Sequence, residues 1–237
     1  KIKLSGVGKA KDCKGATIVY NGKTVTDSEK ASLGEGINDL LKPELGTVKL
    51  VKSTKNSSSY DIVFVDSYET VVVSSAGAES LTGKISDATA DDIGATKAYS
   101  LKLDDSVDRV ITVKKGDSEA RLRNLKKDDV ASIKRSLDNT VVDIVVTGES
   151  IVGSASGVTK KLDNTKATIN GEKYDVANIA VNDLRAGAQS TFYLDMFGRV
   201  AFIESAGNGQ LQSGEKYGWL MDAYESENGD DYVVKIM

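Results

Sequence analysis

The sequence has no histidine, and it has a single cysteine and a single proline among its 237 residues. Histidine is the commonest general base near neutral pH and the commonest neutral metal ligand, so its absence removes both from the chain. The lone Cys13 excludes a disulfide within the chain, and such a thiol is more often a small packed residue than a reactive one. Carboxylate, lysine or tyrosine chemistry stays open, but this composition disfavours an enzyme.

Long apolar runs are also missing. No stretch approaches the roughly 18 apolar residues that a membrane-spanning helix needs, so no membrane span is expected. The N-terminus has neither an apolar signal core nor an initiating Met, and we therefore expect the chain to begin inside a mature or processed polypeptide. The 31 basic and 35 acidic residues are interspersed and sum to −4, so no broad electrostatic surface for nucleic acid is expected.

What is present favours strands and turns. Val, Thr, Ser, Gly, Asp and Lys dominate, whereas helical domains carry Leu, Ala and Glu in periodic runs. With 40% hydrophobic residues the chain can bury more core than one compact β-unit needs. Three or so units of about 60–80 residues fit this length.

An internal repeat supports that division. Three segments, residues 16–65, 111–146 and 167–203, share one order of features: a strand, a tight turn, a strand, a connector, a turn in which Leu adjoins Lys or Arg, and a long hairpin. We expect an all-β chain of tandem small barrel- or sandwich-like units. The expected units are residues 1–75, 76–149 and 150–208, and residues 209–237 are expected to begin a fourth, truncated unit.

The turns of the repeat carry their own chemistry. Asn21-Gly22 and Asn170-Gly171 suit two-residue type I′ turns, because both central residues need a positive φ. In the hairpin turn at residues 195–198, Gly198 suits the left-handed position. Tyr20 to Thr24 superficially resembles a phosphate-binding loop, but that motif needs Gly where Thr17 stands, so we interpret the segment as a hairpin turn.

Two short helical turns are expected within this β-chain. One falls in residues 30–41, where Pro43 would end it and two glycines weaken it. The other falls at residues 122–127.

Candidate binding chemistry is sparse, and no catalytic, cofactor or metal residue is assigned. Hard oxygen ligands can hold Ca²⁺, so Ca²⁺ binding remains a hypothesis without assigned ligands, although solvated turns explain the acidic groups better. Those groups are Asp91-Asp92, Asp104-Asp105 with Asp108, Asp128-Asp129, and Asp230-Asp231. Tyr217, Trp219 and Tyr224 are candidates for a sugar-binding platform, but a core Trp is the preferred interpretation. Residues 56–58 match a glycosylation acceptor, a pattern that is frequent by chance.

With these features assembled, the chain resembles the repeated β-rich regions of large surface proteins from Gram-positive, clostridia-like bacteria, many of which carry S-layer homology domains. The matching stretches are ATIVYNGKTVT, LGTVKLVKS with SYDIVFVDSYETVVV, DLRAG with STFYLDMFGRVAFIES, and EKYGWLMDA. Residues 76–106 match least well, and no S-layer homology motif is present in the chain. The resemblance implies a secreted, extracellular, non-catalytic module at the cell envelope surface, serving spacing, lattice formation or display.

The resemblance also implies partners: other copies of the chain, neighbouring surface-protein domains, or cell-wall glycan. Two other classes of function remain open. A glycan-binding module would present an exposed aromatic pair beside amide or carboxylate groups. A virion or tail structural protein would assemble symmetrically into rings or tubes. An enzyme is the least favoured class, and fold alone does not choose among these functions.

Overall fold

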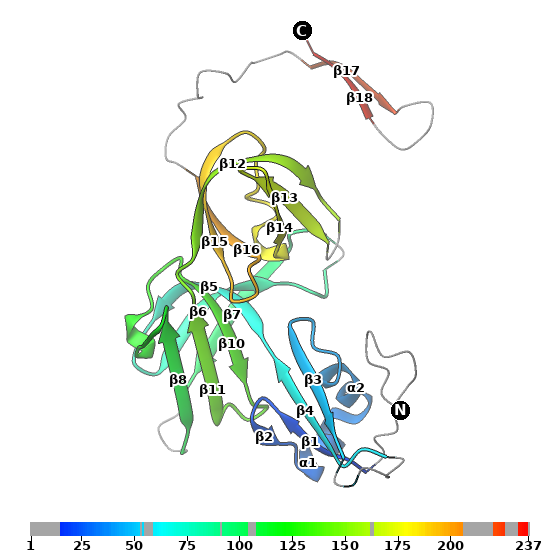
Figure 1. The fold of residues 1–237 in the computed structure, drawn as a ribbon, viewed down its shortest axis with the longest axis vertical. Helices are drawn as coiled ribbons and strands as arrows, with labels where there is room; N and C mark the ends of the chain where they lie inside the picture. The colour runs from blue at the N-terminus through cyan, green and yellow to red at the C-terminus, as the bar shows by residue number, and fades with distance from the viewer. Residues whose placement is uncertain are drawn as a thin grey trace. The chain divides into compact units, whose positions relative to one another are not determined.

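The computed structural model describes residues 15–52, 54, 59–90, 92–103, 108–161, 164–205, 220–225 and 232–236, the last two ranges in their backbone alone. The chain divides into two units, residues 1–205 and residues 206–237, which are described separately. Strands dominate the described chain (Figure 1), which confirms the expected all-β class. Within those ranges, no helix has the length and apolar character needed to cross a membrane.

The first sheet, called the N-terminal sheet, has four strands in the order β2-β1-β4-β3. They are β1 (Thr17–Tyr20), β2 (Lys23–Thr24), β3 (Gly46–Val51) and β4 (Ile62–Ser67). Asn21 and Gly22 join β1 to β2 with φ of 49° and 85°, which confirms the predicted two-residue turn. Alternate side chains of β4, Val63 and Val65, are buried with Ile18 of β1 and form a small core.

Two short helical segments lie where the sequence predicts them. The first consists of α1 (Asp27–Leu33), η1 (Gly34–Gly36) and α2 (Ile37–Leu40), and Pro43 follows its end. It begins earlier than expected, because Thr26 caps α1 reciprocally with Glu29 and satisfies backbone N–H groups of the first turn. The second is η2 (Leu122–Asn124).

The second sheet, called the central sheet, has seven strands in the order β7-β6-β5-β10-β11-β8-β9. They are β5 (Glu69–Ala76), β6 (Ser80–Ser86), β7 (Thr96–Lys102), β8 (Val110–Lys115), β9 (Ser118–Glu119), β10 (Val130–Arg135) and β11 (Val141–Val146). Its core includes Val71, Leu81, Ile133 and Ile144, all fully buried. Burial of each such side chain contributes roughly 1.5–3 kcal/mol, so this core is the largest source of stability described in the chain.

The third sheet closes into a barrel in the order β12-β13-β14-β16-β15. Its strands are β12 (Ser150–Thr159), β13 (Thr165–Ile169), β14 (Glu172–Val176), β15 (Gln189–Leu194) and β16 (Val200–Ser205), and η3 (Asn178–Ala180) follows β14. Phe192 and Ile169 fill the interior. The predicted Asn170-Gly171 turn is confirmed by φ of 51° and 89°, and Gly198 has the predicted positive φ of 74°.

Two of the three segments of the predicted repeat share one topology. In the N-terminal and central sheets a short hairpin (β1-β2 or β8-β9) leads through a helical turn to a long hairpin (β3-β4 or β10-β11). The last strand of each long hairpin then pairs in parallel with the first strand of the short one. The barrel differs, because its last strand, β16, pairs in parallel with β14, the second strand of the short hairpin, through the single pair of Val176 with Val200, and β12 closes the sheet.

The linkers between the three sheets are short. Only Tyr68 separates β4 from β5, and only residues 147–149 separate β11 from β12. The expected division near residue 76 falls at the end of β5, which pairs with β10 and is part of the central sheet. In the separate C-terminal unit, β17 (Leu220–Glu225) and β18 (Tyr232–Ile236) form an antiparallel hairpin.

Candidate functional site at the unit junctions

The long hairpins of the central sheet and the barrel end in equivalent five-residue turns. These turns are residues 136–140 and residues 195–199, and the fourth residue of each, Asn139 or Gly198, has a positive φ of 56° or 74°. Both turns contact the preceding sheet, the first through Asp138 and the second through Asp195. We call residues 136–140 the first tip and residues 195–199 the second tip.

The first junction joins the N-terminal sheet to the central sheet through Asn21. This side chain is 2% exposed although it sits in a turn. Its Nδ2 donates to the backbone oxygen of Arg135 at 2.7 Å, and its Oδ1 accepts from the backbone N–H of Ser67 at 2.7 Å. One amide therefore connects the end of β4 with the end of β10, and it satisfies two backbone groups on different sheets.

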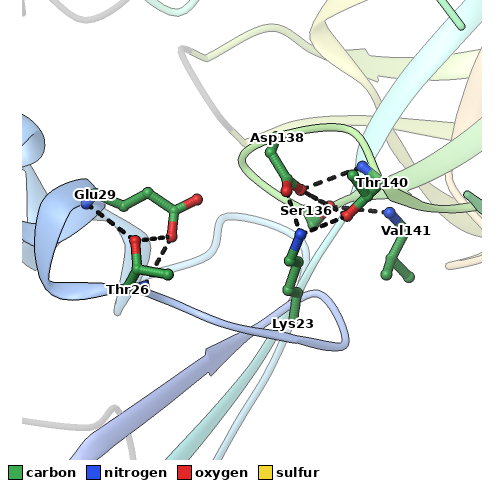
Figure 2. A network of polar contacts seen from close by, with 7 residues as sticks. All are labelled: Lys23, Thr26, Glu29, Ser136, Asp138, Thr140 and Val141. Atoms are coloured by element: carbon green, nitrogen blue, oxygen red, sulfur yellow. Dashed lines mark hydrogen bonds and ion pairs between the residues drawn. The ribbon is translucent and has the colours of Figure 1, made fainter. Parts of the chain in front are cut away.

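A charged network lies beside Asn21 and includes the first tip (Figure 2). Lys23 of β2 forms an ion pair with Asp138 and donates to Oγ1 of Thr140 at 2.8 Å. Asp138 also accepts hydrogen bonds from Oγ of Ser136 and from the backbone N–H of Thr140. The first tip is thus held in shape by Asp138 and attached to the preceding sheet by Lys23.

Burial alone would raise the pKa of Asp138, but hydrogen bonds from Lys23, Ser136 and Thr140 outweigh it and hold the pKa well below its ordinary value. A depressed carboxyl pKa contributes stability that is present above the unfolded value of about 3.9 and is lost as the pH falls through the folded value. We therefore expect the wild-type chain to be more stable than Asp138→Asn at pH 7, and the difference to shrink below about pH 4. Urea unfolding of both proteins across this range measures it; a difference independent of pH would contradict the proposed role of the ionised carboxylate.

A second cation of this junction is Lys134 of β10. It bridges Asp66 of β4 at 3.0 Å and Asp143 of β11 at 3.1 Å. Burial alone would lower the pKa of Lys134, but the hydrogen bonds to the two carboxylates outweigh this effect. The net pKa lies above its ordinary value, so the charged form is favoured. The same ammonium lies 5.6 Å from the ring centre of Tyr68, the linker residue between the two sheets.

The second junction joins the central sheet to the barrel through Asp195, whose side chain is fully buried. Its Oδ1 accepts the backbone N–H groups of Phe197 and Arg199, both at 3.0 Å, which fixes the second tip. Its Oδ2 accepts from Nε of Arg199 at 2.9 Å and from Oγ1 of Thr70 in β5 at 3.0 Å. Arg199 in turn donates to Thr70 at 3.1 Å, so the three side chains form a closed triangle across the junction.

Apolar and aromatic contacts extend this second junction. The apolar cluster at the interface contains Val130 of the central sheet with Ile179 and Ala201 of the barrel. Phe197 at the second tip packs edge-on against Tyr68, with ring centres 5.5 Å apart. Tyr68 therefore touches Lys134 on one sheet and Phe197 on another, so one linker side chain is shared by both junctions.

Four acidic binding candidates lie within the described residues. Asp129 is paired with Lys115 at 2.6 Å, Asp128 is half-buried, and Asp92 and Asp108 are exposed. The candidates outside the described residues are Cys13, residues 56–58, Asp91, Asp104-Asp105, Tyr217, Trp219 and Asp230-Asp231, and only the backbone of Tyr224 is described. Within the described ranges, no three His, Cys, Asp or Glu side chains gather as metal ligands would.

The sequence marks Asn21 and residues 195–198 only as turns and does not indicate that they contact a neighbouring sheet. Asp195 and Arg199 are oppositely charged and four residues apart across the second tip, which is a local signal for a fixed loop. Their partner Thr70 lies 125 residues from Asp195, and no local pattern indicates it.

No protein-family model, no curated protein and no solved structure matches this chain. The class that the structure itself defines is an all-β chain in which the three sheets of residues 15–205 are joined by specific side-chain contacts.

Proposed function

We propose that this chain is a non-catalytic structural module of a bacterial cell-surface protein of the S-layer kind, serving spacing, lattice formation or display. The observation that carries the proposal is the pair of junctions. The first tip is attached to the N-terminal sheet, and the second tip is attached to the central sheet. A chain of independent β-domains on flexible linkers would not need a buried carboxylate such as Asp195 at the contact between two of them.

The linkers support a role in spacing. One residue, Tyr68, joins the first two sheets, and three residues join the second to the barrel. Repeats that contact mainly their neighbours extend a structure in one direction, and rigid contacts between them set a defined distance. A surface lattice or display stalk needs that property.

The proposed location is the outside of the cell envelope, and the proposed partners are further copies of the chain or neighbouring domains of surface proteins. The support is the resemblance of the repeated stretches and the high content of turns and charged residues on small β-units.

Immunogold labelling of the source cells with an antibody to this chain tests the location. We expect continuous label along the outer surface, because a lattice or display protein covers the envelope. Label confined to the cytoplasm would contradict the proposal, and label on discrete particles would favour a virion component.

A further inference from the structure

A hollow of about 310 Å³ lies between the central sheet and the barrel, beside the second junction. Its volume is at the small end of the range of about 300–1,000 Å³ that is typical of ligand pockets. Its walls come from β5, β6, the loop before β7, the turn before β10, the segment after β14, and β16. It therefore exists because the two sheets are fixed against each other.

The wall of the hollow at Gly94 is held by two hydrogen bonds from opposite sides. The backbone N–H of Gly94 donates to Oδ1 of Asn178 at 2.9 Å, and its carbonyl accepts from Nδ2 of Asn182 at 3.0 Å. The backbone of Gly94 lies so close to the side chain of Asn182 that a Cβ added at Gly94 would be 2.6 Å from the amide oxygen of Asn182. The loop and the barrel are thus locked together, and the hollow is formed before any ligand arrives.

The opposite wall is fixed through Asp128. This residue has a positive φ of 70°, and its backbone N–H donates to the carbonyl of Val73 at 2.8 Å. Asp128 therefore lines the hollow from a fixed backbone position, and its carboxylate lies 4.0 Å from the ammonium of Lys127, a second lining residue.

The chemistry of the lining selects among ligand classes. Val72, Ala201 and Phe202 provide an apolar surface, and the Phe202 ring lies 5.6 Å from the ring of Tyr193. The charged lining residues are Lys84, Lys127, Asp128 and Asp183, two of each sign. Balanced charges favour neither a strong anion nor a cation, and their hydrogen-bonding capacity disfavours a purely apolar ligand.

We propose that this hollow binds a neutral saccharide of one or two rings. A sugar ring presents an apolar C–H face, which suits the Phe202 surface, and hydroxyl groups at its edge, which suit carboxylates, amides and ammonium groups. The one aromatic residue among the described lining residues, Phe202, comes from the barrel, and most polar groups come from loops at the junction. The site goes beyond the structural role, because a spacer could lack it.

The test uses the full chain labelled with ¹⁵N and three probes: N-acetylglucosamine, its β-1,4-linked disaccharide, and lactose. Amide NMR spectra are recorded as each probe is added to millimolar concentration. We expect saturable shifts at Gly94, Asp183 and Phe202 with at least one probe. Absence of saturable shifts at these residues with all three probes would overturn the proposal.

A pair of matched variants locates the binding. Asp183→Asn removes a lining carboxylate, and we expect affinity to fall about tenfold, as for the loss of one charge-assisted hydrogen bond. Asp117→Asn is the control, because Asp117 is exposed in the β8-β9 turn and is not part of the lining; its affinity should equal that of the wild type. Equal affinity of the wild type and both variants would overturn the assignment of binding to this hollow. The spectrum of each protein without saccharide shows directly whether it is folded.

Discussion

Replacing Asp195 with Ala should destabilise the chain by about 3–5 kcal/mol, the largest effect that we expect from any polar substitution in it. The substitution leaves Arg199 without its buried carboxylate and removes the acceptor of two backbone N–H groups and of Thr70. Removing one member of a buried charge pair costs more than the pair contributes, because the remaining charge stays away from water. Urea unfolding followed by circular dichroism measures the loss.

Asp175→Ala is the matched control for this effect. Asp175 lies on the same barrel and pairs with Lys166 at 3.0 Å, but both side chains are more than half exposed. Exposed pairs contribute about 0–1 kcal/mol, so this variant should be nearly as stable as the wild type. Equal losses for the two variants would show that burial at the second junction does not matter.

Replacing Asn21 with Ala should cost about 3–4 kcal/mol, the second largest effect. Two backbone groups, on Arg135 and Ser67, lose their partner at the first junction, and because both bonds are partly buried each loss costs about 1 kcal/mol, the low end of the range for an unsatisfied group. Alanine must also take the left-handed conformation that Asn21 has with φ of 49°.

Asn170→Ala separates these two causes. Asn170 has nearly the same backbone, with φ of 51°, in the equivalent Asn-Gly turn of the barrel, but it is exposed and makes a single side-chain bond, to the carbonyl of Val152. It should lose the conformational part, about 1–2 kcal/mol, and little more, because the carbonyl of the exposed residue Val152 can bond to water instead. If the two variants lose the same stability in urea unfolding, the junction role of Asn21 is wrong.

Local features of the chain are well predicted from its sequence, because they depend on neighbouring residues. The Asn-Gly turns follow from the positive φ that both positions need, and the left-handed Gly198 follows from the same rule. The helical segment before Pro43 is also predicted, although its start at the Thr26 cap was missed.

Long-range pairings are not predicted, because nothing local encodes them. The parallel pairs β1 with β4 and β8 with β11 join strands that are separated in the chain by two other strands and a helical segment, and their apolar patterns do not distinguish parallel from antiparallel neighbours. For the same reason the sequence does not show that β5 adds to β10 and extends the central sheet.

The junction site is hidden for a further reason. Thr70 and Asn21 are ordinary residues for a strand and a turn, and their importance comes from burial against a distant hairpin tip. Burial at a contact between sheets depends on how the sheets pack against each other. The sequence shows only that the turns are charged and polar, and it does not show which of them become buried.

The three sheets of residues 15–205 should form one rigid spacer. A distance measurement between spin labels at Lys49→Cys in the N-terminal sheet and Lys173→Cys in the barrel tests it most directly, with Cys13→Ser to remove the native thiol; both label sites are exposed. We predict a single narrow distance distribution that broadens when Asn21→Ala and Asp195→Ala are added. A broad distribution in the protein with both junctions intact would contradict the account.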